Sequence, residues 1–186
     1  FRPFLVKEQK ILMIAQESGD ESQIGAAVGQ LVSGCTFGSV DANVNPMFDI
    51  EYVFLQLRSK SVGAKLKLMV TCPDDNETQV EVEVDIDDIG VQMSLEHTQD
   101  VEITDDISLR FRYPKLKDLQ GMSGELSDFE KTLILIVECV DKITSGGETI
   151  DRIDMTKDEI VEFIDSMNAN QLENVLKFYE SMPKVR

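Results

Sequence analysis

The acidic residues between positions 85 and 96 are the side chains best placed to do chemistry, because their spacing partly matches a calcium-binding loop of the EF-hand type. Such a loop takes carboxylate ligands at positions 1, 3 and 12 and an oxygen ligand at position 5. Asp85, Asp87 and Glu96 fall at the carboxylate positions. Ile89 falls at position 5 and has no side-chain oxygen, and the preceding residues alternate like a strand instead of forming an entering helix. A calcium- or other metal-binding module centred on residues 85–96 is therefore the alternative function, not the first.

A cysteine and a histidine are the other candidates for chemistry. Cys72 and Pro73 match one half of a zinc knuckle, but Asp75 stands where the second thiolate is needed, and no cysteine pair follows. His97 is the single histidine, and no serine or cysteine lies near it at a spacing typical of a nucleophile and its base. We expect His97 at the surface of a polar turn. The sequence predicts no catalytic, cofactor-binding or metal-binding residue, and hence a protein that is not an enzyme.

Charge excludes several classes of function. The 186 residues include 35 acidic and 18 basic side chains, which gives a formal net charge of −17. Nucleic-acid binding depends on lysine and arginine displacing counterions from phosphates, so this charge argues against a nucleic-acid ligand. It also repels anionic lipids, and no apolar run approaches the roughly 18 residues that suggest a membrane span. We expect neither nucleic acid nor a membrane among the partners.

The composition is typical of one folded domain in a reducing compartment. The hydrophobic fraction of 42% and the charged fraction of 28% are near the average for globular proteins. Cys35, Cys72 and Cys139 are far apart in sequence and odd in number, which argues against a disulfide framework. We expect a single domain over residues 1–186.

Helical patterns dominate residues 1–63. Apolar residues recur at helical spacing over residues 5–17 and again from Asp20, which can cap a second helix, to Cys35. A third helix is predicted over residues 47–60, after a loop rich in Gly, Asn and Asp.

Residues 64–113 are predicted to form a mostly antiparallel β-sheet. Apolar and polar residues alternate in three stretches, at residues 65–70, 80–86 and 107–113. The second stretch carries three carboxylates on its polar face. If it lies in the middle of the sheet, these carboxylates are flanked by basic residues from both neighbours, namely Lys65, Lys67, Arg110 and Arg112.

Residues 114–186 are predicted to be mainly helical. Ser127 with Glu130 forms a capping box before a largely apolar helix, and two more helix starts are marked by Thr156 and by Asn168 or Asn170. A small β-hairpin is expected over residues 143–155, around the turn Gly146-Gly147, and a connecting loop over residues 121–124. The predicted fold class is therefore α+β, with N-terminal helices, a central sheet, and a C-terminal helical part with a small hairpin.

Several segments together resemble the family of T4-type bacteriophage baseplate hub subunits and hub assembly proteins. They are RPFLVKE at residues 2–8, ESGD at 17–20, FDIEYVFLQLRSKSVG at 48–63, IDSM at 164–167 and FYESMPK at 178–184. The resemblance spans nearly the whole chain. This sequence departs from the family pattern in three places. Family members usually begin with an extended segment that is absent before Phe1, and many continue past the MPK tail into a cysteine-containing segment that is absent here. Related members often have a second cysteine after Cys-Pro, where Asp75 stands in this sequence.

The resemblance implies a function carried out through protein contacts. It implies a baseplate hub protein of a contractile-tailed phage, either a structural subunit of the virion or an assembly chaperone, with no cofactor and no catalytic residue. The implied partners are other phage baseplate hub or tail proteins. The implied location is the host cytoplasm during assembly or the tail baseplate of the virion.

The third predicted helix is the place where we expect the protein-contact surface. It combines an apolar face with charged residues on the remainder, a pattern suited to a contact that is both apolar and electrostatically specific. The candidate interaction residues are Phe48, Asp49, Glu51, Tyr52, Arg58 and Lys60. The alternative is that the apolar members of this face belong to the core.

Overall fold

The computed structural model describes residues 1–119 and 126–186, without the side chain of Glu21. The connecting loop predicted at residues 121–124 lies outside the described residues. The chain divides into two compact units, the first made of residues 1–91 and 185–186 and the second of residues 92–184. The described residues form six α-helices and several antiparallel sheets, which confirms the α+β class. The expectation of a single domain stays a prediction.

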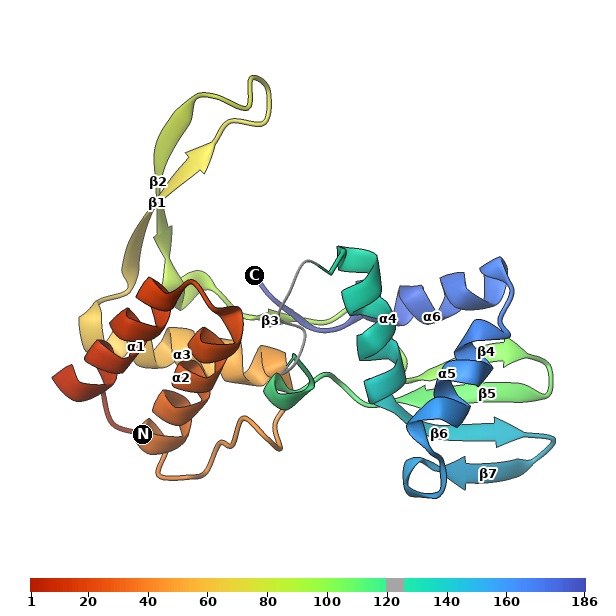
Figure 1. Cartoon of the computed structure of the whole chain (residues 1–186). Helices are drawn as coiled ribbons and strands as arrows, with labels where there is room; N and C mark the ends of the chain where they lie inside the picture. The colour runs from red at the N-terminus through yellow and green to blue at the C-terminus, as the bar shows by residue number, and fades with distance from the viewer. Residues whose placement is uncertain (120–125) are drawn as a thin grey trace. The chain divides into compact units, whose positions relative to one another are not determined.

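Three helices make up the body of the first unit (Figure 1), namely α1 (Val6–Ser18), α2 (Glu21–Cys35) and α3 (Met47–Val62). Asp20 caps α2 as predicted, because its carboxylate accepts hydrogen bonds from the backbone N–H groups of Ser22 and Gln23. Helix α1 ends at Gly19, whose φ of 66° suits a left-handed C-cap. All three helices predicted from apolar spacing are therefore present.

The core of the first unit lies mainly between α2 and α3. Its most deeply buried side chains are at most 2% exposed and include Leu31, Val32, Cys35, Ile50 and Leu57. Helix α1 contributes less than its sequence predicts, because Ile11 and Ile14 are 44% and 67% exposed, and the residues that it buries are Glu8 and Ala15. The expected apolar stripe of α1 is thus largely on the surface.

A two-stranded antiparallel ribbon follows α3 and extends away from the three helices (Figure 1). It consists of β1 (Lys65–Thr71) and β2 (Gln79–Asp85), in a register that places Leu68 opposite Val82. Beyond the ribbon, the chain forms a short 3-10 helix, η1 (Ile86–Asp88), whose Ile86 is fully buried. Ile86 thereby anchors the base of the ribbon to the helical body.

The second unit contains a four-stranded antiparallel sheet with strand order β4-β5-β6-β7. These strands are β4 (Asp100–Thr104), β5 (Ile107–Phe111), β6 (Val140–Ser145) and β7 (Glu148–Asp151). The helices are α4 (Asp128–Cys139), α5 (Lys157–Asp165) and α6 (Ala169–Ser181), with 3-10 helices η2 (Leu116–Leu119) and η3 (Arg152–Asp154). Sheet and helices share one core, whose fully buried side chains include Leu109, Phe111, Ile136, Ile160 and Val175.

Local sequence signals explain where the elements of the second unit begin and turn. Each of the three helices starts with a reciprocal capping box, made by Ser127 with Glu130, Thr156 with Glu159, and Asn168 with Gln171. Gly146 and Gly147 have φ values of 58° and 86°, as a tight hairpin turn between β6 and β7 requires. The predicted turn and helix starts are confirmed, but the hairpin spans residues 140–151 and not 143–155, because residues 152–154 form η3.

The prediction of one central sheet is wrong in one respect. The acidic strand β2 pairs with β1 alone, whereas β5 lies in the sheet of the second unit, between β4 and β6. Arg110 and Arg112 therefore do not flank β2; they pair with Asp100 and Asp118. Alternation shows that a segment is a strand but not which strand it pairs with, because pairing depends on contacts distant in sequence.

Two short strands complete the fold. β3 (Val91–Gln92) pairs with β8 (Lys184–Val185). Next to them, within the first unit, Gly90 and Arg186 exchange two backbone hydrogen bonds of 2.8 and 3.0 Å. The end of the described chain is thus tied to the residues that follow η1.

Candidate interaction surfaces

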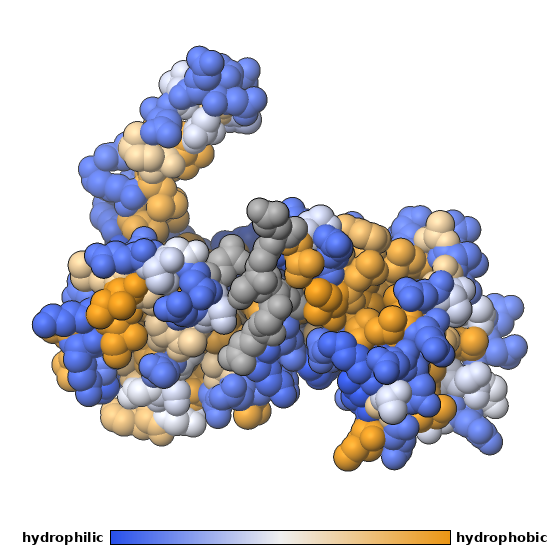
Figure 2. Space-filling view, in the orientation of Figure 1, coloured by the Kyte–Doolittle hydropathy of each residue, from blue (hydrophilic) through white to orange (hydrophobic). Residues whose placement is uncertain are grey.

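One face of the β1–β2 ribbon is apolar along its whole length. The cross-strand pairs on this face are Leu66 with Val84, Leu68 with Val82, and Val70 with Val80. The pair nearest the helices is half-buried, but the four side chains farther out are 40–46% exposed. In Figure 2, hydrophobic residues are visible along the stem of the ribbon, while its free end is hydrophilic. We call these six residues the apolar face.

The opposite face of the ribbon is polar and internally paired. Lys65 lies 2.6 Å from Glu83, and Lys67 lies 2.7 Å from Glu81, each across the two strands. All four side chains are at least 47% exposed, so each pair contributes at most about 1 kcal/mol to stability. These pairs favour the observed register between β1 and β2. A shift of one residue would move the lysines of β1 to the face that carries the valines.

The loop that joins the two strands is an ordered and acidic tip. Asp75 accepts hydrogen bonds of 3.0 Å from the backbone N–H groups of Glu77 and Thr78, and it also bonds the Thr78 hydroxyl. These bonds hold the pKa of Asp75 below its usual value. Asp75, placed by resemblance where the family has a second cysteine, thus caps the turn. We call residues 72–78 the acidic tip.

Two other carboxylates of the acidic tip are unneutralised. Asp74 and Glu77 are exposed, and the described structure gives neither side chain an ion pair or a hydrogen bond. The segment from residue 65 to residue 85 contains six acidic and two basic residues, and both of those bases are used on the polar face. The negative charge therefore concentrates at the free end of the ribbon.

The structure places the six candidate residues of α3 along the helix without gathering them into one patch. Phe48, Asp49, Tyr52 and Arg58 are half-buried, and Glu51 and Lys60 are exposed. At about 1.5 Å of rise per residue, the first and last of them are separated by roughly 18 Å. With about 100° of turn per residue, they also point in different directions around the axis.

The basic pair at the C-terminal end of α3 already has partners within the first unit. Arg58 donates to the backbone oxygen of Gly63 at 3.1 Å, and Lys60 lies 3.7 Å from Asp87. Ser59 also donates to Asp87, at 2.7 Å. Arg58 and Lys60 thus stabilise the junction between α3 and the ribbon, a role that their spacing alone does not reveal.

An apolar cleft lies beside the middle of α3. It has a volume of about 370 Å³, and it is lined from α3 by Tyr52, Val53, Gln56 and Leu57. The remaining lining residues are Phe1 and, after α2, Thr36, Ser39 and Val40. Tyr52 is the candidate residue that borders it, so this is the part of α3 with room for a partner side chain.

The residues of the calcium-loop pattern have other tasks. Asp85 caps η1 by accepting a 3.0 Å hydrogen bond from the backbone of Asp87, and Asp87 binds Ser59 and Lys60. Residues 79–85 form a strand where an EF-hand needs a helix. Among residues 1–119 and 126–186, no group of three or more His, Cys, Asp and Glu side chains is arranged to hold a metal ion.

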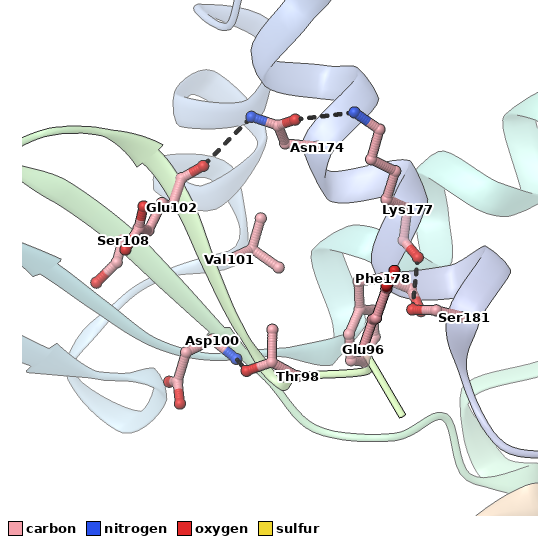
Figure 3. Close-up of a pocket in the computed structure, with 10 residues that line it drawn as sticks. All are labelled: Glu96, Thr98, Asp100, Val101, Glu102, Ser108, Asn174, Lys177, Phe178 and Ser181. Carbon is pink, nitrogen blue, oxygen red and sulfur yellow. Dashed lines mark hydrogen bonds between the residues drawn. The ribbon is translucent and has the colours of Figure 1, made fainter. Parts of the chain in front are cut away.

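The second unit carries an open polar groove of about 630 Å³ between α6 and the edge of its sheet (Figure 3). Glu96, Asp100 and Glu102 line one side, and Asn174, Lys177 and Ser181 line the other. Asn174 donates a 3.5 Å hydrogen bond to the Glu102 backbone oxygen and accepts one of 3.4 Å from the Lys177 ammonium. Asp100 pairs with Arg110 outside the groove. This arrangement suits polar contacts with another molecule more than acid and base catalysis, which needs carboxylates in contrasting environments.

His97 is not the free surface residue that the sequence predicts. Its ring is half-buried, with Nδ1 2.9 Å from the Ser181 hydroxyl and Nε2 3.0 Å from the Tyr113 hydroxyl. The ring also lies 5.2 Å from the ring of Phe178. Burial lowers the pKa of His97. The partners lie 84 and 16 residues away in sequence, so no local spacing could have indicated them.

Comparison with known proteins points to one family. No helix in the described part of the chain combines the length and apolarity that a bilayer crossing requires. No curated protein and no solved structure matches the chain. The family model described as T4 bacteriophage base plate protein, in contrast, matches residues 1–186. The chain therefore belongs to the T4 bacteriophage base plate protein family.

Proposed function

We propose that this protein is a baseplate hub protein, a structural subunit or an assembly chaperone, which works through contacts with other hub or tail proteins and without catalysis. The observation that carries the proposal is the apolar face of the ribbon, whose four outer side chains are 40–46% exposed. The family supports the setting, because a phage baseplate is an assembly of many proteins. The protein would act in the host during tail assembly, in the finished baseplate, or in both.

The ribbon supports a binding role for a physical reason. A two-stranded ribbon alone is marginally stable in water. The apolar face of a sheet is normally covered by a helix or by another sheet. Here Leu68, Val70, Val80 and Val82 are left 40–46% exposed. A contiguous exposed apolar surface of this kind is typical of a protein interface.

Helix α3 is proposed as a second contact region. The six residues Phe48, Asp49, Glu51, Tyr52, Arg58 and Lys60 remain our candidates there, and Glu51 and Tyr52 are the most useful to test. Glu51 is exposed, and Tyr52 borders the apolar cleft. Replacing Glu51 with Lys would weaken a contact made there without disturbing the core.

Co-expression tests the proposal. The full chain is produced together with each baseplate hub protein of a T4-type phage, captured through a tag, and the captured species is measured by light scattering. We expect a stable complex of fixed ratio with at least one hub protein. A chain that stays alone with every hub and tail protein would refute the proposal.

Purified mature phage particles separate the two forms of the proposal. Peptides of this chain at a fixed ratio to other baseplate proteins would identify a structural subunit. Peptides found in infected cells but missing from purified particles would identify an assembly chaperone. Quantitative mass spectrometry of both samples makes this comparison.

A further inference from the structure

We propose that the β1–β2 ribbon is the docking site for a positively charged protein, whose apolar surface, flanked by lysine or arginine, covers the apolar face and reaches the acidic tip. This inference names the kind of partner bound by the ribbon, and it rests on the proposed function.

The apolar face is arranged so that another apolar surface can pack against it. Its six side chains project from the same side of the ribbon in three directly opposed pairs, because alternate residues of a strand face the same way. Exposure increases away from the helices, from half-buried at Leu66 and Val84 to 46% at Val70. The unit itself therefore covers the base of this face and leaves its outer two thirds for another molecule.

The acidic tip determines the charge of that molecule. Asp74 and Glu77 lie at the end of the ribbon, and both lysines of the ribbon already pair with Glu81 and Glu83 on the opposite face. A partner that covers the apolar face out to Val70 and Val80 comes next to the unneutralised carboxylates. Complementary charge at the rim favours association and selects the partner, so this partner should be basic there.

A second copy of the chain is the less favourable occupant. Two copies stacked on their apolar faces would each bring an acidic tip, and each chain carries a net charge of −17. Like charges placed together at an interface oppose association.

Site-specific photo-crosslinking during infection tests the inference. The photo-reactive amino acid p-benzoylphenylalanine is placed in the full chain at Val82 on the apolar face, or at Met69 on the polar face as a matched control. A third version carries it at Tyr52 on α3. We expect Val82 to crosslink to a phage protein, at an apolar site flanked by lysine or arginine, and Met69 to give a much lower yield.

A charge variant supplies the second readout. Asp74→Asn with Glu77→Gln removes two charges and leaves the Asp75 cap intact. The Val82 crosslink should fall by roughly threefold to tenfold, the loss expected for two exposed ion pairs. An unchanged yield, a crosslink between two copies of the chain, or equal yields at Val82 and Met69 would each overturn the inference.

The same experiment distinguishes the two proposals. A crosslink from Tyr52 to a baseplate protein, with none from Val82, would keep the proposed function and refute the ribbon as the docking site. A crosslink from Val82 to a basic protein outside the baseplate would support the docking site and refute the hub function.

Discussion

Arg112 and Asp118 form a two-pronged ion pair in the second unit, with Nη1 2.6 Å from Oδ2 and Nη2 2.9 Å from Oδ1. The Asp118 side chain is 4% exposed, and it also accepts a 2.8 Å hydrogen bond from the backbone of Lys115. Burial raises the pKa of Asp118, but the bonds from Arg112 and Lys115 together outweigh it and leave this pKa below its usual value. The pair fixes the chain that leaves β5, because Arg112 also donates to the Glu138 backbone oxygen at 2.7 Å.

Replacing Asp118 with Asn should destabilise the protein by about 3 kcal/mol, because it leaves the Arg112 guanidinium partly buried without its charge partner. Urea unfolding followed by circular dichroism measures the change. Asp100→Asn is the matched control, since it breaks the exposed pair with Arg110 and should cost less than about 1 kcal/mol. Equal losses in the two variants would show that the Arg112–Asp118 pair has no special structural role.

Glu8 should make the stability of the first unit sensitive to acid. It accepts hydrogen bonds from Arg2 at 2.9 Å and from the Leu5 backbone at 2.6 Å, and the Arg2 bond is the main cause that lowers the pKa of Glu8 to about 2. An unfolded glutamate has a pKa of about 4.3. The folded state therefore binds fewer protons, so its extra stability is present above about pH 4.3 and is lost as the pH falls towards about 2.

The thermal midpoint as a function of pH tests this. The midpoint of Glu8→Gln should fall less steeply than that of the original protein between pH 5 and about 2. Glu17→Gln, on the same helix, removes the same charge and serves as the matched control. Parallel curves for Glu8→Gln and the original protein would contradict the assignment.

The single histidine allows a direct test of its environment. Because burial lowers the pKa of His97, its ring resonance should titrate by NMR below the ordinary value of about 6.5. The unfolded chain then takes up the proton first, so the contribution of His97 to stability is present above about pH 6.5 and is lost as the pH falls through the folded pKa. Titration at or above 6.5 would mean that the ring is not half-buried in solution.

Two glycines should respond in opposite directions to alanine. Gly147→Ala places a side chain at a φ of 86° in the turn between β6 and β7, which should cost about 1–2 kcal/mol. Gly34→Ala, near the end of α2, meets no atom within 4 Å and should stabilise the helix by about 0.5 kcal/mol. Thermal unfolding of both variants gives the signs, and a stabilising Gly147→Ala would contradict the assigned turn.

Local sequence signals predicted most of the secondary structure. Asp20, Ser127, Thr156 and Asn168 each cap a helix at the predicted place, because a cap depends on residues only two or three positions away. The turn at Gly146 and Gly147 is local in the same sense. The family resemblance likewise depended on short segments, and the match over residues 1–186 confirms it as far as a T4-type baseplate protein.

Contacts distant in sequence were not predictable in this way. The alternation at residues 65–70, 80–86 and 107–113 gives three strands but not their division between two sheets. The exposure of the apolar face follows from that division, and the partners of His97 also come from distant parts of the sequence. The acidic residues of β2 and of the acidic tip could be recognised in the sequence. That they lie on a projecting two-stranded ribbon is known only from the structure.

Complementation of a phage that lacks its own copy of this gene tests the central claim most directly. The host supplies the original chain, Leu68→Thr with Val82→Thr on the apolar face, or Met69→Thr on the polar face; threonine keeps the strand propensity in each. We predict that the original chain and Met69→Thr restore plaques and complete tails, while the double variant stays folded and fails to do so. Full complementation by the double variant would contradict a function that depends on the apolar face of the ribbon.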